Sequence, residues 1–202
     1  MNKFKGIYGI SDENLTPYDK IFEMLEVASK SGMKIFQLRD KHHRDNEIFQ
    51  LCTEIKDFCN QNNIVFIIND RVDLAFRVNP EGLHIGADDG CLKEVKKYFE
   101  GKVGVSCYDS LKLAIKAQNE GADYVAFGAF FQSQTKPQAK KASLKLLIQA
   151  KQVIKIPICA IGGINHQNII QLKEADMIAI VSGIWKGNIA ENMKLLKKNW
   201  QG

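Results

Sequence analysis

The sequence predicts an α/β fold, a (β/α)8 barrel, and three observations carry that prediction. Short runs rich in β-branched residues alternate with amphipathic stretches of helical period along the whole chain. The runs begin 18 to 33 residues apart, which is about the length of one strand and one helix. No G-x-G-x-x-G follows the first run, so an open doubly wound sheet lacks its usual nucleotide site. Eight parallel units then close most simply into a TIM barrel, expected as a single domain over residues 1–202.

Each expected strand is an apolar run bounded by Gly, Asp or Asn. The eight runs are 6–11, 34–40, 64–70, 82–86, 102–107, 124–130, 157–163 and 177–183. Residues 18–31 and 45–62 place their apolar side chains on one helical face, and 193–200 is expected to be a last amphipathic helix.

The composition, 45% hydrophobic and 25% charged, is typical of a globular protein and argues against disorder. No apolar run approaches the roughly 20 residues that span a bilayer. No secretory signal is visible at the start of the sequence, so a cytoplasmic protein without a membrane partner is expected. The five cysteines are odd in number and form no C-x-x-C pair, which predicts free thiols rather than disulfides or a zinc site.

The net charge of +5 is local. Residues 124–173 contain seven lysines and no acidic residue. Such a region can attract nucleic acid, a membrane surface or a small phosphorylated ligand. Nucleic acid is not expected as a partner, because these lysines are not interleaved with aromatic residues and no recognised module is present.

The second strand places cations at its end. Its odd-numbered residues share one face, so Gln37, Arg39 and Lys41 are expected to point into the barrel mouth. Phe36 and Leu38 then pack against the helices. Burying unpaired cations is costly, so an anionic ligand is expected there. The alternative is that the strand ends early and leaves both cations in water.

Carboxylates follow the third and fourth strands, at Asp70 and Asp89. Carboxylates after adjacent strands can meet across the mouth and suit Mg²⁺, with helix N-capping as the alternative. His84 lies inside the fourth strand and is expected to be a hydrogen-bonded barrel residue rather than a metal ligand. Ser106 ends the fifth strand with a small hydroxyl.

The residues that follow the last three strands complete two anion sites. The loop after the sixth strand carries Ser133, Thr135 and Lys136, which suit phosphate, and Lys136 is expected to join Arg39 and Lys41 in the cationic site. Gly163 and Ser182 follow the seventh and eighth strands, where many barrels hold a phosphate. The mouth thus combines a site for Mg²⁺ and diphosphate with a backbone cradle for a phosphate monoester. No Ser-His-Asp or Cys-His arrangement supports covalent acyl chemistry.

In this order the motifs resemble the thiamine phosphate synthase (thiamine-phosphate pyrophosphorylase) family over nearly the whole chain. They are QLRDK at 37–41, NDR at 69–71, GLHIG at 82–86 with Asp89, GVS at 104–106, GADY at 121–124, SQTK at 133–136, AIGGI at 160–164 and VS at 181–182. The sequence departs from the family in Ser133, where Thr is frequent, and in a short segment at 173–176 that lacks the Gly-Ala-Asp phrase.

The resemblance implies a transferase of thiamine biosynthesis. It would condense 4-amino-2-methyl-5-(diphosphooxymethyl)pyrimidine with 4-methyl-5-(phosphooxyethyl)thiazole, giving thiamine phosphate and pyrophosphate by Mg²⁺-assisted ionisation of the diphosphate. The implied contacts of the pyrimidine diphosphate are Gln37, Arg39, Lys41, Asn69, Ser106 and Lys136. Four of these are the implied catalytic residues, namely Arg39, Lys41, Ser106 and Lys136. The implied contacts of the thiazole phosphate are Ser133, Thr135, Gly163, Val181 and Ser182, and the implied Mg²⁺ ligands are Asp70 and Asp89.

Three alternatives remain open at this level. A thiazole tautomerase shares the barrel but needs no metal-bound diphosphate, so the two carboxylates argue against it. A sugar-phosphate isomerase or epimerase usually needs a paired general acid and base, and no convincing pair is present. A noncatalytic metabolite-binding barrel would not need the acid and lysine set. The sequence leaves homo-oligomerisation open.

Overall fold

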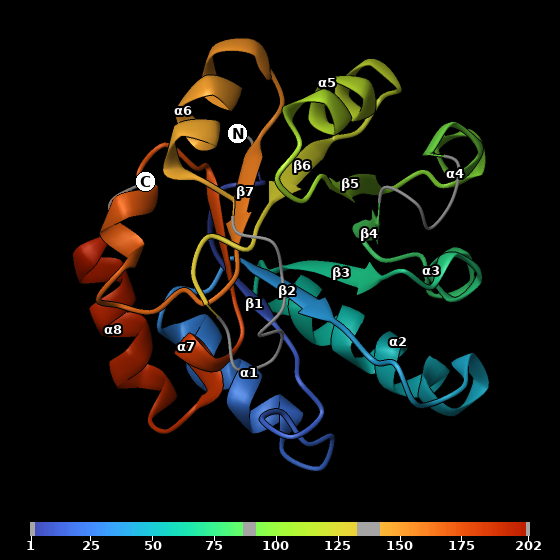
Figure 1. Cartoon of the computed structure of the whole chain (residues 1–202). Coiled ribbons are helices and arrows are strands. Elements are labelled where there is room, and N and C mark those ends of the chain that lie inside the picture. Colours follow the sequence, from blue (N-terminus) through green and yellow to red (C-terminus); the bar gives the residue numbers. More distant parts are fainter. Residues whose placement is uncertain (1–2, 87–91, 133–141, 201–202) are drawn as a thin grey trace.

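A computed structural model of the protein describes residues 3–86, 92–132 and 142–200. Eight parallel strands form one closed barrel in chain order, and β8 pairs back to β1 (Figure 1). The predicted (β/α)8 barrel is therefore confirmed. The strands are β1 (Gly6–Ile10), β2 (Ile35–Leu38), β3 (Val65–Asn69), β4 (Gly82–Gly86), β5 (Lys102–Ser106), β6 (Tyr124–Phe127), β7 (Ile158–Ile161) and β8 (Met177–Ile180).

Helices surround the barrel and bury their apolar faces against it (Figure 1). They are α1 (Ile21–Lys30), α2 (Asp45–Gln61), α3 (Val72–Val78), α4 (Leu92–Tyr98), α5 (Leu111–Asn119), α6 (Leu144–Val153), α7 (Ser182–Trp185) and α8 (Ile189–Asn199). Between β7 and β8, where every residue is described, the connection holds only a 3₁₀ turn, η1 (Ile169–Leu172).

Several strands end sooner than the sequence predicts. The last residue of β2 paired with β3 is Leu38, and the next N–H, that of Arg39, donates to Ser11 Oγ at 2.8 Å. The Ser11 hydroxyl therefore replaces the neighbouring strand as the hydrogen-bond partner of the backbone at this point. At β8 the extended run stops before Ser182, because that residue begins α7.

Alternation along the strands produces two cores. Phe36 and Leu38 face outward into the layer between barrel and helices, as predicted. The inner face fills the barrel with side chains and leaves no pore. The inner core is Phe4, Tyr8, Ile10, Ile35, Val65, Ile67, Tyr124, Ala126, Cys159, Met177 and Ala179. Apolar packing at the N-terminal end of the barrel leaves its polar inner residues at the opposite end, where the strands finish.

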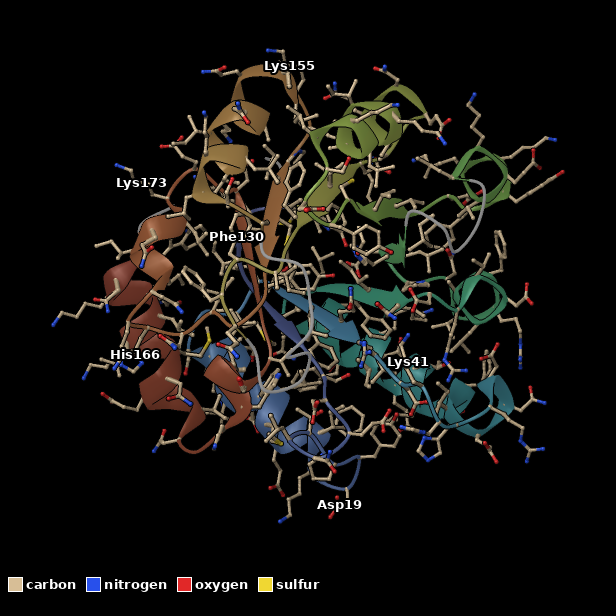
Figure 2. The ribbon with its side chains drawn as sticks, viewed as in Figure 1. Asp19, Lys41, Phe130, Lys155, His166 and Lys173 are labelled. Carbon is tan, nitrogen blue, oxygen red and sulfur yellow. The ribbon has the colours of Figure 1, made fainter. Side chains whose placement is uncertain are left out.

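The described cysteines are buried, and the described lysines of the acid-free stretch lie at the surface. Cys52, Cys59, Cys107 and Cys159 are buried free thiols, while Cys91 lies outside the described residues. The described lysines of the acid-free stretch are all exposed, and Figure 2 shows Lys155 and Lys173 on the periphery. They are ordinary surface lysines. None of the described helices is both long enough and apolar enough to cross a membrane.

Candidate active site

A cavity of about 290 Å³ lies at the C-terminal ends of the strands. In parallel barrels this is the end where chemistry occurs. Most of the predicted contacts that fall within the described residues line it, namely Gln37, Arg39, Asn69, Ser106, Gly163, Val181 and Ser182. A larger and more open cavity, about 640 Å³, lies at the N-terminal end beside exposed Lys3, Lys5, Lys34 and Lys197. The strand-end cavity is the candidate active site.

The floor of this cavity is polar and hydrogen-bonded. Gln37 is only 2% exposed, and its amide Nε2 donates to the Tyr8 hydroxyl at 2.6 Å. His84 has both ring nitrogens engaged, with Tyr124 at 2.9 Å and with Ser106 at 2.9 Å. Burial lowers the pKa of His84 to about 4, so the imidazole is neutral at pH 7. The prediction that His84 is a hydrogen-bonded barrel residue is confirmed.

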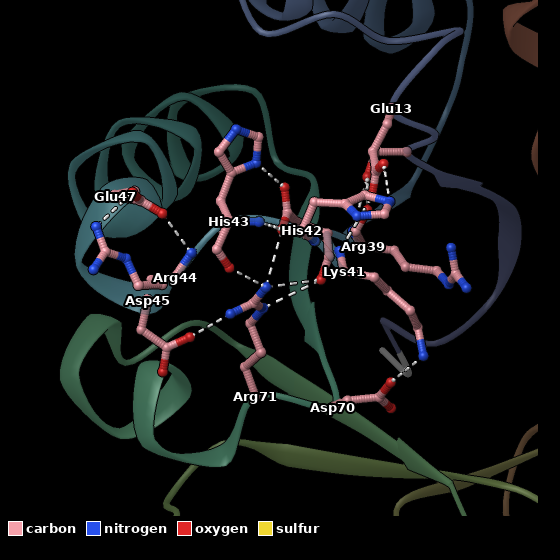
Figure 3. A network of polar contacts seen from close by, with 12 residues as sticks. Glu13, Arg39, Lys41, His42, His43, Arg44, Asp45, Glu47, Asp70 and Arg71 are labelled. Carbon is pink, nitrogen blue, oxygen red and sulfur yellow. Dashed lines mark hydrogen bonds and ion pairs between the residues drawn. The ribbon is translucent and has the colours of Figure 1, made fainter.

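The cations predicted at the end of β2 take different positions. Arg39 lines the cavity, and its backbone is held between β1 and β2 by Ser11. Lys41 lies on the loop after the strand with 53% of its side chain exposed, and its Nζ is 3.5 Å from Asp70 Oδ2. The side chains of Arg39 and Lys41 extend toward the same side in Figure 3. Lys41 and Asp70 therefore form a charged rim beside the cavity rather than part of its lining.

Asp70 is fixed by its backbone. Its φ of +62° is left-handed, and its N–H donates to the His84 carbonyl at 2.8 Å. The helix that follows, α3, has Arg71 as its N-cap residue, so the alternative that Asp70 serves as a helix cap is wrong. Its carboxylate is left to face Lys41 at the mouth.

Arg71 and Asp40 hold this rim together, although neither was predicted as a site residue. Asp40 is buried, with 1% of its side chain exposed, and accepts from Arg71 Nη2 at 2.9 Å. Arg71 also donates to the His43 carbonyl at 2.6 Å and to Asp45 Oδ1 at 2.5 Å (Figure 3). Because Arg71 directly follows Asp70, these bonds tie the loop carrying Lys41 to the turn carrying Asp70.

Asp40 is ionised in the fold. Burial alone would raise its pKa, but hydrogen bonds from Tyr18 and His43 outweigh that effect and lower the pKa to about 2. The backbone N–H groups of His42 and His43 donate to Asp40 Oδ1 as well. The sequence does contain a signal for this role. Strand alternation would place Asp40 on the same face as the buried Phe36 and Leu38, where a carboxylate needs partners.

The opposite side of the mouth is built from backbone. Gly163 has a φ of +62°, and a Cβ placed on it would lie 2.3 Å from the Gln132 carbonyl oxygen. Asn168 Nδ2 donates to the Gly163 carbonyl at 2.9 Å and fixes this turn. Val181 and Ser182, where β8 passes into α7, lie beside it in the cavity lining. The carbonyl oxygens of Phe131 and Gln132 occupy the space that a Cβ at position 163 would need, so only glycine fits there.

Some predicted residues cannot be placed. Ser133, Thr135, Lys136 and Asp89 lie outside the described residues, and their predicted roles stay predictions. No cluster of three or more His, Cys, Asp or Glu suited to a metal is found among the described residues. Asp70 alone of the predicted Mg²⁺ ligands is therefore placed, with a carboxylate of the kind that Mg²⁺ prefers.

Comparison with known proteins identifies the family of this chain. The family model described as thiamine monophosphate synthase matches residues 7–184. The thiamine-phosphate synthase of Wolinella succinogenes is 42% identical over 205 residues, which cover 98% of this chain and 95% of the relative. The thiamine-phosphate synthase of Alcanivorax borkumensis is 39% identical over 182 residues, which cover 89% of this chain and 84% of that relative.

Solved structures give the same result. Thiamine phosphate pyrophosphorylase from Pyrococcus furiosus superposes with a TM-score of 0.88 at 29% identity, covering 98% of this chain and 96% of that one. A 3-hexulose-6-phosphate synthase, at a TM-score of 0.73 and 14% identity, shares the fold alone. From the matched family model and these relatives, the chain belongs to the thiamine monophosphate synthase family.

Proposed function

We propose that the two sides of the mouth divide the two substrates of thiamine phosphate synthesis between them. As a member of its family the protein is a transferase that forms thiamine phosphate. The pyrimidine diphosphate lies on the side of β2 to β5, and the thiazole phosphate on the side of β7 and β8. The observation that carries this proposal is a single cavity with charged and amide side chains on one side and glycine backbone on the other.

On the diphosphate side, Arg39 supplies guanidinium donors to the cavity and Lys41 adds charge at the rim. These cations neutralise the negative charge that develops on the departing pyrophosphate as the C–O bond ionises. Gln37, Asn69 and Ser106 line the floor and hold the pyrimidine ring in place. Lys136 is proposed to join them at the diphosphate.

On the thiazole side, the close-packed backbone at Gly163 and the turn at Val181 and Ser182 receive the phosphate monoester. Ser133 and Thr135 are proposed to add hydroxyl donors. The thiazole nitrogen is then held against the reacting carbon, and holding two reactants in place supplies a large part of the rate. No general base is needed, in agreement with a buried, neutral His84 whose nitrogens are both occupied.

Mg²⁺ is proposed as the cofactor, held by Asp70 with Asp89. The hard carboxylate oxygens of Asp70 at the charged rim fit this ion. When bound, Mg²⁺ would screen the diphosphate oxygens and improve the leaving group. Lys41 Nζ lies 3.5 Å from this carboxylate, so the proposed metal ligand and the cation share the same rim.

The proposal is tested by incubating the protein with both heterocyclic phosphates and Mg²⁺ and measuring thiamine phosphate and pyrophosphate together. Equal amounts of both products are expected. Arg39→Gln should lower kcat/KM for the pyrimidine diphosphate about 100-fold, because a charge-assisted contact to the leaving group is lost. Arg77→Gln is the matched control, since Arg77 bonds Asn46, stacks on Phe49 and does not line the cavity, and it should leave the rate unchanged.

The metal assignment has its own readout. Asp70→Asn should raise the Mg²⁺ concentration needed for half-maximal rate, because one anionic oxygen ligand becomes neutral. An unchanged Mg²⁺ requirement would remove Asp70 from the metal site. Rearrangement of the thiazole phosphate alone, without release of pyrophosphate, would replace the synthase proposal by a tautomerase.

A further inference from the structure

Five side chains are hydrogen-bonded in series across the inside of the barrel. The chain runs from the Gln37 amide to the Tyr8 hydroxyl at 2.6 Å, then to the Tyr124 hydroxyl at 3.2 Å. From Tyr124 it continues to His84 Nδ1 at 2.9 Å, and from His84 Nε2 to Ser106 Oγ at 2.9 Å. The two ends, Gln37 and Ser106, both line the active-site cavity and are both proposed pyrimidine contacts.

The middle of this chain is enclosed by packing. Tyr8 and Tyr124 are each at most 1% exposed, and Phe4 stacks on the Tyr124 ring at 5.2 Å between centroids. Gly104 makes room for that ring, because a Cβ there would lie 2.0 Å from Tyr124 Cζ. Among the described residues, the two hydroxyls have no hydrogen-bond partners outside the chain. Each therefore has to place its single hydrogen on a member of the chain.

The direction of every bond follows from the first one. Gln37 donates from Nε2, so the Tyr8 oxygen accepts and its hydrogen must go on to Tyr124. Tyr124 must in turn donate to His84 Nδ1, which therefore carries no hydrogen. The hydrogen of the neutral imidazole is then on Nε2 and is donated to Ser106. The hydroxyl hydrogen of Ser106 is left for a ligand in the cavity.

We propose that Tyr8, Tyr124 and His84 are positioning residues that set the hydrogen-bond polarity of the pyrimidine pocket. They hold His84 in the Nε2–H tautomer and so make Ser106 a donor to the ligand. They also hold the Gln37 amide with its carbonyl oxygen free to accept. The pocket then selects a heteroaromatic ring that offers an amino donor to Gln37 and a ring-nitrogen acceptor to Ser106. This inference rests on the proposed function, and it specifies which hydrogen-bonding groups the pyrimidine ring must present to the pocket.

The opposite polarity is a defined alternative. A reversed Gln37 amide would accept from Tyr8, and every hydrogen in the chain would then move one step the other way. His84 would carry its hydrogen on Nδ1, and Ser106 would have to donate to His84 and could only accept from a ligand. The two polarities can therefore be told apart by which ring nitrogen of His84 carries the hydrogen. Because burial lowers the pKa of His84 to about 4, both remain neutral forms at pH 7.

The tautomer is read by ¹⁵N NMR of the histidine-labelled protein at pH 7, with the His84 signals assigned by their loss in His84→Asn. We expect the shifts of an Nε2–H imidazole. Tyr124→Phe removes the donor to Nδ1 and should shift the signals toward a mixture of both tautomers. An Nδ1–H tautomer or an imidazolium in the unaltered protein overturns the inference.

Kinetics test the consequence for the ligand. Tyr8→Phe and Tyr124→Phe keep the rings but cut the chain, and each should raise KM for the pyrimidine diphosphate about tenfold, as loss of an oriented hydrogen bond does. KM for the thiazole phosphate should not change. An analogue without the ring amino group should be rejected by the unaltered protein and less strongly by both variants.

The control is Tyr98→Phe, because Tyr98 lies on α4 with 66% of its surface exposed. It should behave as the unaltered protein does. If the two chain variants changed both KM values equally, or only lowered the melting temperature, their role would be structural and the inference would fail. The synthase activity of the unaltered protein would still stand in that case, so the two failures are distinguishable.

Discussion

The two sides of the active-site mouth are held in place by different forces. On the side of β2 and β3, the loop carrying Lys41 is fixed by the buried Asp40 and its bonds to Arg71. On the side of β7 and β8, the turn at Gly163 is fixed by close packing against the Gln132 carbonyl. The first side thus depends on charge and responds to pH, while the second depends on shape and does not.

The largest effect that separates the two sides is expected for Asp40→Ala. It leaves the Arg71 guanidinium without its buried carboxylate and should cost about 3 kcal/mol of unfolding free energy. Chemical denaturation measures this loss. Asp19→Ala is the matched control, because Asp19 is exposed at the periphery (Figure 2). An equal and small loss in both variants would show that the rim does not depend on this ion pair.

A smaller effect is expected from acid alone. The pKa of Asp40 is about 2 in the fold against an ordinary value of 3.8, so between these values the unfolded chain binds more protons. The stabilisation is therefore fully present above about pH 4 and is lost as the pH falls toward 2, a change of about 2 kcal/mol. Denaturation at a series of pH values measures it. In Asp40→Asn this part of the pH dependence should be absent, and its persistence would assign it to other carboxylates.

The smallest effect is expected on the shape-dependent side. Gly121→Ala and Gly163→Ala both place a side chain at positive φ, but only Gly163 has backbone atoms close to the new Cβ. Gly163→Ala should therefore be less stable than Gly121→Ala by about 1 kcal/mol, as expected for local overpacking. It should also raise KM for the thiazole phosphate and leave KM for the pyrimidine diphosphate unchanged. Equal behaviour of the two variants in both measurements would mean that this turn relaxes freely.

The barrel could be predicted from the sequence because its signals are local. Each strand is an apolar run with a turn residue at its end, and alternation alone placed Gln37 inside and Phe36 outside. The same rule put Arg39 in the mouth. The extent of the strands was less predictable, since β2 ends where the Ser11 side chain replaces a strand partner.

The contacts that orient the site join residues far apart in the chain. Arg71 and Asp40 are 31 positions apart, and Tyr8 and Tyr124 are 116 apart. Their polar groups on otherwise apolar faces indicate that partners are needed, but the identity of those partners depends on which strands become neighbours. Only the closed barrel determines that, and hence only the structure reveals the hydrogen-bond chain beneath the proposed pyrimidine pocket.

The pairing of β8 with β1 has a consequence for synthesis of the protein in the cell. Residues 6–9 of β1 pair with Met177–Ile180 of β8. Beside this pairing, Nε1 of Trp185 on α7 donates to the Ile10 carbonyl at 2.7 Å, although the two residues are 175 positions apart. While the chain emerges from a ribosome, β1 keeps one unpaired edge until β8, Met177–Ile180, has been translated. An unpaired strand edge is a site for association with other chains. Nascent chains stalled before Met177 should therefore be held by chaperones, and full-length chains should be released from them.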